Sequence, residues 1–173
     1  MKTGIKPPSV TDICTKAKRS VEEVNAFLDL LKRSMEPFSK RISVIENGIT
    51  RYYAVERRGI GILKTEHGKF WQYNFAIDDQ WEKYSVIVKA ELDKNLLIPV
   101  FNNKDQLVLR TDSGCETGQV FGDLTCECND QLHLALKTLE EIGEGMLINI
   151  PRQDGRGMGL TFKLATLWIQ DVL

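Results

Sequence analysis

The sequence predicts a mixed α+β or α/β fold, in which a bent mixed sheet of five to eight strands packs against helices and follows an N-terminal helix. Three observations support this. Apolar residues recur at helical spacing after residue 20, and strand-like stretches separated by turn signals follow from residue 42. The order after residue 106 is strand, loop, helix, strand, loop, helix, which requires a crossover connection. We therefore expect an N-terminal helical extension over residues 1–40 and one main domain over residues 41–173.

The composition limits the class of partner. The 173 residues include 23 basic and 24 acidic side chains, a balance that gives no electrostatic reason to expect a nucleic-acid polymer or an anionic membrane as partner. The longest apolar run, Leu96 to Phe101, contains Pro99 and is too short to span a bilayer. The first residues have no apolar segment typical of a secretory signal. We therefore expect a cytoplasmic protein, in which clustered thiols are more often metal ligands or catalytic groups than disulfides.

The N-terminal region is expected to contain one helix. Pro7 and Pro8 disfavour helix, so residues 1–10 are expected to be irregular. Ser20 and Glu23 have the spacing of a capping box, which marks a helix start. The apolar positions that follow at helical spacing are Val21, Val24, Phe27, Leu28 and Leu31.

The middle of the chain is predicted to form a series of strands. Asn47-Gly48 separates two strand-like segments and supplies the positive φ values that a primed hairpin turn needs. Arg57 and Arg58 are expected at the solvated surface. The remaining expected strands are residues 59–65 and 69–77 on either side of Glu66-His67-Gly68, then 85–92, 96–101 and 106–111.

Two helices and a strand are expected after Cys128. Asn129 or Asp130 is expected to cap the first helix, and Gly143 and Gly145 to end it. Residues 146–151 are expected to form a buried strand, and a final helix is expected over roughly Leu160–Val172. The apolar face of the first helix carries Leu132, Leu136, Leu139 and Ile142.

Three of the four cysteines, Cys115, Cys126 and Cys128, fall within fourteen residues. On an extended segment the last two point the same way with Cα atoms ~6.6 Å apart, whereas two thiolates on one zinc ion lie ~3.7 Å apart, a gap that a local bend closes. His133 lies further along a helix and His67 on a distant hairpin, so neither is expected as a fourth ligand. Three protein ligands leave a position for water, which is typical of catalytic zinc.

Two alternatives to this catalytic site remain open: reduced cysteines in the core, and a closed structural zinc site that uses His133. We expect one Zn²⁺ per chain.

A glycine- and arginine-rich segment, residues 152–159, precedes the last expected helix. Glycines let backbone N–H groups approach an anion, and Arg152 and Arg156 offer paired donors to phosphate oxygens. Glycine-rich turns are common before helices, so the prediction of a phosphate site here depends on the cysteines nearby.

Together these motifs resemble the GTP cyclohydrolase II family, a zinc enzyme of riboflavin biosynthesis. The resemblance extends from about Lys64 to Gln170. It implies a GTP cyclohydrolase II-like fold, a homodimer, and hydrolysis of the imidazole ring of GTP. That reaction releases formate and diphosphate and leaves a 2,5-diaminopyrimidine ribonucleotide phosphate. The motifs that carry the resemblance are Arg110-x-x-Ser113-x-Cys115, Cys126-x-Cys128-x-x-Gln131-Leu132, Gly143-x-Gly145-x-Leu147 and Arg152-Gln153-x-Gly155-Arg156-x-x-Gly159-Leu160.

The resemblance also implies site residues. The three clustered cysteines become the zinc ligands, and Gln131, one turn into its helix, is placed to hydrogen-bond the guanine edge. Mg²⁺ is expected to accompany the nucleotide. The implied nucleotide contacts are Arg110, Thr111, Asp112, Ser113, Gly114, Gln131, Asp154, Gly155 and Arg156.

The chain also departs from the family pattern. Asp112 and Gly114 replace a usual His and Glu, Asp154 replaces a Glu, and Leu167 replaces a tyrosine. The family's acid/base aspartate and nucleophilic arginine lie in a continuation beyond the last helix, so the sequence assigns no catalytic residue here. We therefore expect the 173-residue chain to bind a purine nucleotide and to convert GTP poorly or not at all. The alternatives are a relative that opens a different purine or pyrimidine ring, and a catalytically impaired zinc-containing nucleotide-binding module.

Overall fold

The computed structural model describes residues 8–78, 84–103, 105–151 and 153–173. The chain divides into two compact units, Met1–Glu36 and Pro37–Leu173. Within the described residues, no helix is both long enough and apolar enough to cross a membrane.

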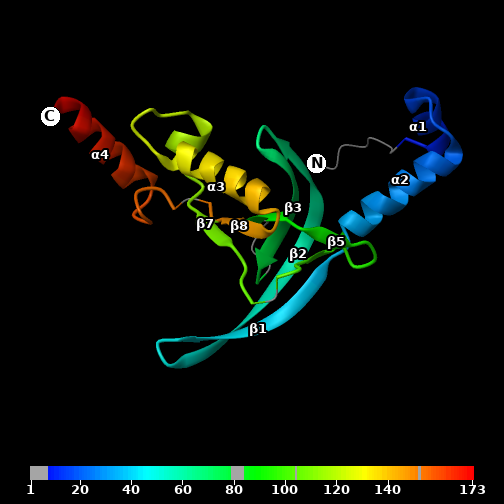
Figure 1. Ribbon diagram of the computed structural model, residues 1–173, viewed down its shortest axis with the longest axis horizontal. Coiled ribbons are helices and arrows are strands. Elements are labelled where there is room, and N and C mark those ends of the chain that lie inside the picture. Colours follow the sequence, from blue (N-terminus) through cyan, green and yellow to red (C-terminus); the bar gives the residue numbers. More distant parts are fainter. Residues whose placement is uncertain (1–7, 79–83, 104, 152) are drawn as a thin grey trace, which may run out of the picture. The chain divides into compact units, whose positions relative to one another are not determined.

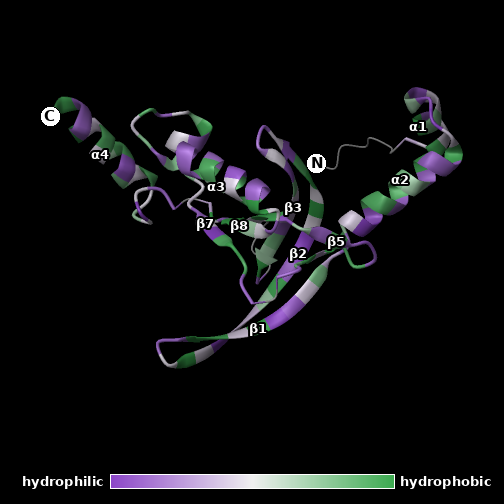
Figure 2. Ribbon diagram, viewed as in Figure 1, coloured by the Kyte–Doolittle hydropathy of each residue, from purple (hydrophilic) through white to green (hydrophobic). Residues whose placement is uncertain are grey.

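The first unit contains two helices, α1 (Val10–Ala17) and α2 (Val21–Ser34). The capping box predicted at Ser20 and Glu23 is confirmed, and hydrophobic and hydrophilic positions alternate along α2 (Figure 2). Helix α1 was not predicted, and it begins at Val10, inside the segment that was expected to be irregular. A second capping box, formed by Ser9 and Asp12, starts it.

The second unit is built on a mixed, curled six-stranded sheet, which confirms the predicted fold class (Figure 1). In the described part of the chain its strand order is β1-β2-β3-β4-β8-β7, and β5 and β6 form a separate pair. All neighbouring strands are antiparallel except β7 and β8, which are parallel. The strands are β1 (Phe38–Glu46), β2 (Ile49–Thr65), β3 (Gly68–Ile77), β4 (Tyr84–Lys89), β5 (Glu91–Asp93), β6 (Ile98–Val100), β7 (Leu109–Asp112) and β8 (Gly145–Asn149).

The first hairpin forms as predicted, with Asn47 and Gly48 at φ 52° and 77° between β1 and β2. Strand β2 differs from the prediction because it continues through residues 49–65 as one strand, with a register shift between Arg57 and Gly59. The expectation that Arg57 lies at the surface is wrong. Its side chain is buried and donates hydrogen bonds to the carbonyl oxygens of Leu96 and Leu97, which holds the β5–β6 connection against the sheet.

The predicted crossover is confirmed, because helix α3 (Cys128–Ile142) connects the parallel strands β7 and β8. Its N-cap is Glu127 rather than Asn129 or Asp130, and no side chain among the described residues caps it. Gly143 ends the helix at φ 79°, whereas Gly145 is already the first residue of β8. The last helix, α4 (Leu160–Val172), has the predicted bounds.

Helix α3 covers one face of the sheet and forms the core with it (Figure 1). Leu136 and Leu139 of the helix pack with side chains from three different strands, and Leu147 at the centre of β8 is completely buried. The strand members of this cluster are Phe70, Ile87 and Leu147.

Because Leu147 has no exposed surface, Leu147→Ala should leave a cavity and lower the free energy of unfolding by about 2–5 kcal/mol. The matched control is Leu124→Ala, since Leu124 is fully exposed and its loss should change stability by less than about 0.5 kcal/mol. Urea unfolding followed by circular dichroism measures both. Equal effects of the two substitutions would contradict this description of the core.

Candidate metal and nucleotide site

The three clustered cysteines converge from three places in the second unit. Cys115 directly precedes the short π-helix η1 (Glu116–Val120), Cys126 lies in the loop after it, and Cys128 is the first residue of α3. Their sulfur atoms all lie within 4.8 Å of one another. The Sγ atoms of Cys115 and Cys126 are 3.6 Å apart, close to the ~3.7 Å expected for two thiolates on one zinc ion.

The segment from Cys126 to Cys128 is not extended, as the spacing argument assumed. Glu127 between them has helical φ and ψ of −75° and −4°, so the chain bends into α3 at this point. This is the local bend that the zinc geometry required, and it comes from the start of the helix. It also places Cys128 at the N-terminus of α3.

Two small features hold Cys115 in place. Its side chain is 1% exposed and accepts a hydrogen bond from the backbone N–H of Gly118, at 3.4 Å. A Cβ atom on Gly118 would lie 2.8 Å from Cys126 Sγ, so only glycine fits at this position. Because Gly118 has no side chain, η1 can pack directly against Cys126.

Lys163 of α4 completes the surroundings of the thiols. Its Nζ lies 2.7 Å from Cys115 Sγ and 3.2 Å from Cys126 Sγ. Sequence reasoning did not find this residue. The feature that could have identified Lys163 as a site residue is its place in the first turn of the helix that follows the glycine-rich segment.

The ammonium group changes the ionisation of the thiols. Burial raises the pKa of Cys115, but hydrogen bonds from Lys163, Thr117 and Gly118 outweigh it and lower the pKa to about 7. Burial would lower the pKa of Lys163, yet the hydrogen bonds to Cys115 and Cys126 raise it. Burial and the neighbouring thiols raise the pKa of Cys128 to about 11. Cys115 therefore ionises at lower pH than Cys128 when no metal is bound.

His133 does not join the cysteines in this structure. Its Nδ1 lies 2.8 Å from Nε2 of His67, and the two rings meet edge to face. His67 lies in the turn of the β2–β3 hairpin, and the hydrogen bond between the two rings shows that this turn contacts α3. The orientation of His133 also gives no support to a closed site made of His133 and the cysteines.

Asp112 lies buried at the end of β7 and connects three elements. Its carboxylate accepts hydrogen bonds from the backbone N–H of Gly114, from Gln119 Nε2 and from Asn149 Nδ2, at 3.1, 2.7 and 2.6 Å. These partners belong to the loop before Cys115, to η1 and to β8. Asp112 thus fixes the loop that carries Cys115, and its predicted contact with a nucleotide stays a prediction.

The loop before α4 is joined to the loop of Cys115. Asp154 is buried and accepts a hydrogen bond from the backbone N–H of Glu116 at 3.1 Å, and the backbone N–H of Gln153 donates to the carbonyl of Ser113 at 3.1 Å. Gly155 and Arg156 have φ of 60° and 59°, and the Arg156 side chain is exposed. Arg152 lies outside the described residues.

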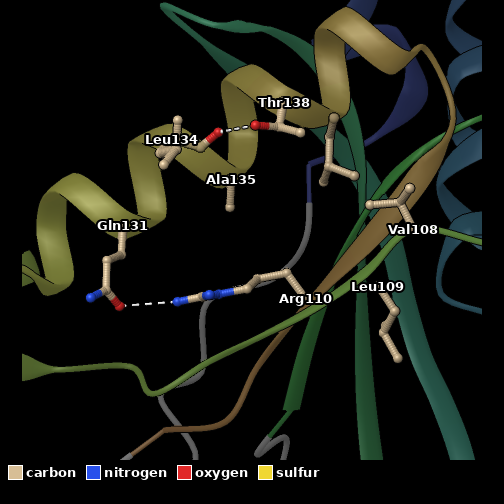
Figure 3. A pocket seen from close by; sticks show the side chains of 8 residues that line it. Val108, Leu109, Arg110, Gln131, Leu134, Ala135 and Thr138 are labelled. Carbon is tan, nitrogen blue, oxygen red and sulfur yellow. Dashed lines mark hydrogen bonds between the residues drawn. The ribbon is translucent and has the colours of Figure 1, made fainter.

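A pocket of about 280 Å³ lies between β7 and α3 (Figure 3). At its rim Arg110 donates a hydrogen bond from Nη2 to Gln131 Oε1 at 3.0 Å. The volume is near the lower end of ligand pockets, so it suits one fused ring system better than a whole nucleotide. Its apolar walls are Val108, Leu109, Leu134, Ala135 and Leu139.

The structure thus brings most of the predicted residues to two adjoining places. Arg110 and Gln131 line the pocket, whereas Ser113, Gly114 and Asp154 lie in the loops around the cysteines. Thr111 is exposed on β7 between Arg110 and Asp112. Gly114 has φ 56°, and a Cβ there would lie 2.8 Å from Cα of Pro151, so this position also needs glycine.

Known proteins with sequences similar to this chain include the following three. RibBA, a riboflavin biosynthesis protein of Parabacteroides distasonis, is 29% identical over 129 residues, which cover 75% of this chain and 27% of that protein. The chloroplastic monofunctional riboflavin biosynthesis protein RIBA 3 of Arabidopsis thaliana is 31% identical over 117 residues, or 68% of this chain and 21% of that protein. GTP cyclohydrolase-2 of Streptomyces coelicolor is 28% identical over 132 residues, or 76% of this chain and 55% of that protein.

The chain therefore spans about a quarter of the first two relatives and about half of the third. A family model agrees with these similarities. The model of GTP cyclohydrolase II matches residues 37–172, which include all of the sheet, the three clustered cysteines and Lys163. This chain belongs to the GTP cyclohydrolase II family.

Proposed function

We propose that this chain forms a zinc-dependent site that hydrolytically opens the imidazole ring of GTP. The reaction would release formate and diphosphate and leave a 2,5-diaminopyrimidine ribonucleotide phosphate, as a step of riboflavin biosynthesis. The observation that supports this proposal best is the convergence of three thiols at zinc spacing in a member of this family. The adjoining pocket and loop supply a place for a nucleotide.

The residues present fit zinc. Cys115, Cys126 and Cys128 are soft sulfur donors, and their mutual distances need little adjustment for one tetrahedral ion. A zinc ion held by three thiolates supplies Lewis-acid activation of water at neutral pH. Lys163 prepares the site before metal binds, because its ammonium favours the thiolate form of Cys115.

The nucleotide would be divided between the pocket and the loops. The pocket between β7 and α3 takes the guanine ring, with the amide of Gln131 at its hydrogen-bonding edge. Arg110 and Arg156, together with backbone N–H groups near Gly155, would face the phosphates, accompanied by Mg²⁺. The remaining proposed contacts are Thr111, Asp112, Ser113, Gly114 and Asp154, of which the two buried carboxylates would act mainly by shaping the loops.

The proposal extends to the setting of the protein. We infer a cytoplasmic homodimer in which the N-terminal helices form an extension of the main domain, and which has neither a nucleic-acid polymer nor a membrane as partner. The near-neutral charge supports the last point. Exposed apolar side chains on α4, among them Trp168, Ile169 and Val172, support contact with a second copy.

Replacement of the ammonium group should change thiol ionisation in the metal-free protein. Lys163→Met removes the cation that donates to Cys115, which disfavours the thiolate, so the thiol titration near pH 7 should move to higher pH. Ultraviolet absorbance of the thiolate against pH measures this. Lys137→Met, on the exposed side of α3, is the matched control and should leave the curve in place. Superimposable curves for all three proteins would show that Lys163 does not control Cys115.

Zinc-loaded protein incubated with GTP and Mg²⁺ tests the proposed reaction directly. One formate should appear for each GTP consumed, at whatever rate the 173-residue chain sustains. Cys126→Ser should abolish formate release because it removes a zinc ligand, whereas Cys14→Ser should retain it because Cys14 lies in the other unit. GTP that binds but stays intact would instead favour a nucleotide-binding module, and GTP consumed without formate would exclude opening of the imidazole ring.

A further inference from the structure

The turn between β2 and β3 and the first half of α3 bring three metal-ligating side chains together, away from the cysteines. Nε2 of His67 lies 2.8 Å from Nδ1 of His133, and Oε1 of Glu66 lies 3.1 Å from Nδ1 of His133 and 3.8 Å from Nε2 of His67. Each residue thus offers one ligand atom to a common point. We propose that Glu66, His67 and His133 form a second metal site, which binds a divalent transition-metal ion such as zinc.

The distances fit such an ion. A circle through three atoms with these separations has a radius of about 1.9 Å, so an ion ~2.0–2.1 Å from each atom lies just outside their plane. That is the arrangement of three ligands around a tetrahedral ion with one position left for water. Two imidazole nitrogens and one carboxylate oxygen also form a donor set that zinc uses in proteins.

Hydrogen bonding alone satisfies these atoms poorly. A neutral imidazole carries one N–H, so a single proton lies between His67 and His133. If His67 donates that proton, Nδ1 of His133 turns its lone pair toward the carboxylate of Glu66, 3.1 Å away, which is repulsive. If His133 donates it instead, one N–H has to serve two acceptors, Nε2 of His67 and Oε1 of Glu66. A cation at the common point instead accepts all three lone pairs.

The backbone holds the three residues in place independently of any metal. The Thr65 hydroxyl accepts a hydrogen bond from the backbone N–H of His67 and donates one to the carbonyl of Gly68, which fixes the turn. A Cβ on Gly68 would collide with the Glu140 carboxylate, so the turn and α3 lie close together at this point. Glu140 in turn forms an ion pair with Lys89 of β4.

The helix presents this face at regular spacing. His133, Leu136 and Glu140 are three and then four residues apart, so they share the side of α3 that faces β3. Leu136 packs in the core with Phe70 of β3, directly beside the turn. The side chains of His67 and His133 are 19% and 42% exposed, which leaves the site accessible from solvent.

The proposal is tested in protein that already carries one equivalent of zinc, by nitrogen-15 spectra of the imidazole rings during addition of a second equivalent. The chain has only two histidines and both are in this cluster, so every imidazole signal reports on it. Both rings should change together and reach saturation at one added equivalent. If the cysteines bind no zinc, the same change appears with the first equivalent, so this outcome does not depend on the proposed function.

Glu66→Gln should weaken zinc binding at the histidines at least tenfold, because it removes a ligand charge. The Glu66 side chain is 70% exposed, so this substitution leaves the fold intact. Glu141→Gln on α3, the helix that carries His133, is the matched control and should bind zinc like the unaltered protein. Imidazole signals that do not change when zinc is added, or equal zinc affinities in the two variants, would overturn the proposal. The two rings would then share only a simple hydrogen bond.

Discussion

Three sulfur atoms from different segments of the chain have to reach one point, and much of the second unit is arranged around that requirement. Cys115 lies at the start of η1, Cys126 in the loop after η1 and Cys128 at the start of α3. Thiols at this distance repel one another once they ionise, so the cluster needs a cation. Lys163 supplies one in this structure, and a zinc ion would supply a stronger one.

Two buried carboxylates hold the loops that make this convergence possible. Asp112 connects the end of β7 to η1 and β8, and Asp154 connects the loop before α4 to the residue after Cys115. Because both carboxylates accept hydrogen bonds inside the fold, movement of either loop would disturb the cysteines. If phosphates bind at the exposed Arg156, a movement of its loop would therefore reach the cysteines through the hydrogen bond between Asp154 and Glu116.

Local patterns in the sequence were sufficient for the elements whose signals are local. The capping box at Ser20, the Asn47-Gly48 turn and the bounds of α4 follow from residues that are neighbours in the chain. The cysteine spacing identified the cluster although it assumed an extended segment. The helical bend at Glu127 supplied the approach that extended geometry lacked.

Local sequence patterns could not predict contacts between residues that lie far apart in the chain. Lys163 lies 48 residues from Cys115, and His67 lies 66 residues from His133, so no periodicity connects either pair. Arg57 looked like a surface residue because its burial depends on carbonyl groups almost forty residues further on. The missed helix α1 is different, since Ser9 and Asp12 carried a readable start signal that the neighbouring prolines obscured.

We propose that Cys115, Cys126 and Cys128 together bind one zinc ion. X-ray absorption at the zinc edge, on protein loaded with one equivalent, tests it most directly. We expect three sulfur neighbours at ~2.3 Å from the zinc ion and one lighter atom. A zinc ion surrounded mainly by nitrogen and oxygen would contradict it, and would place the first equivalent at the histidines instead.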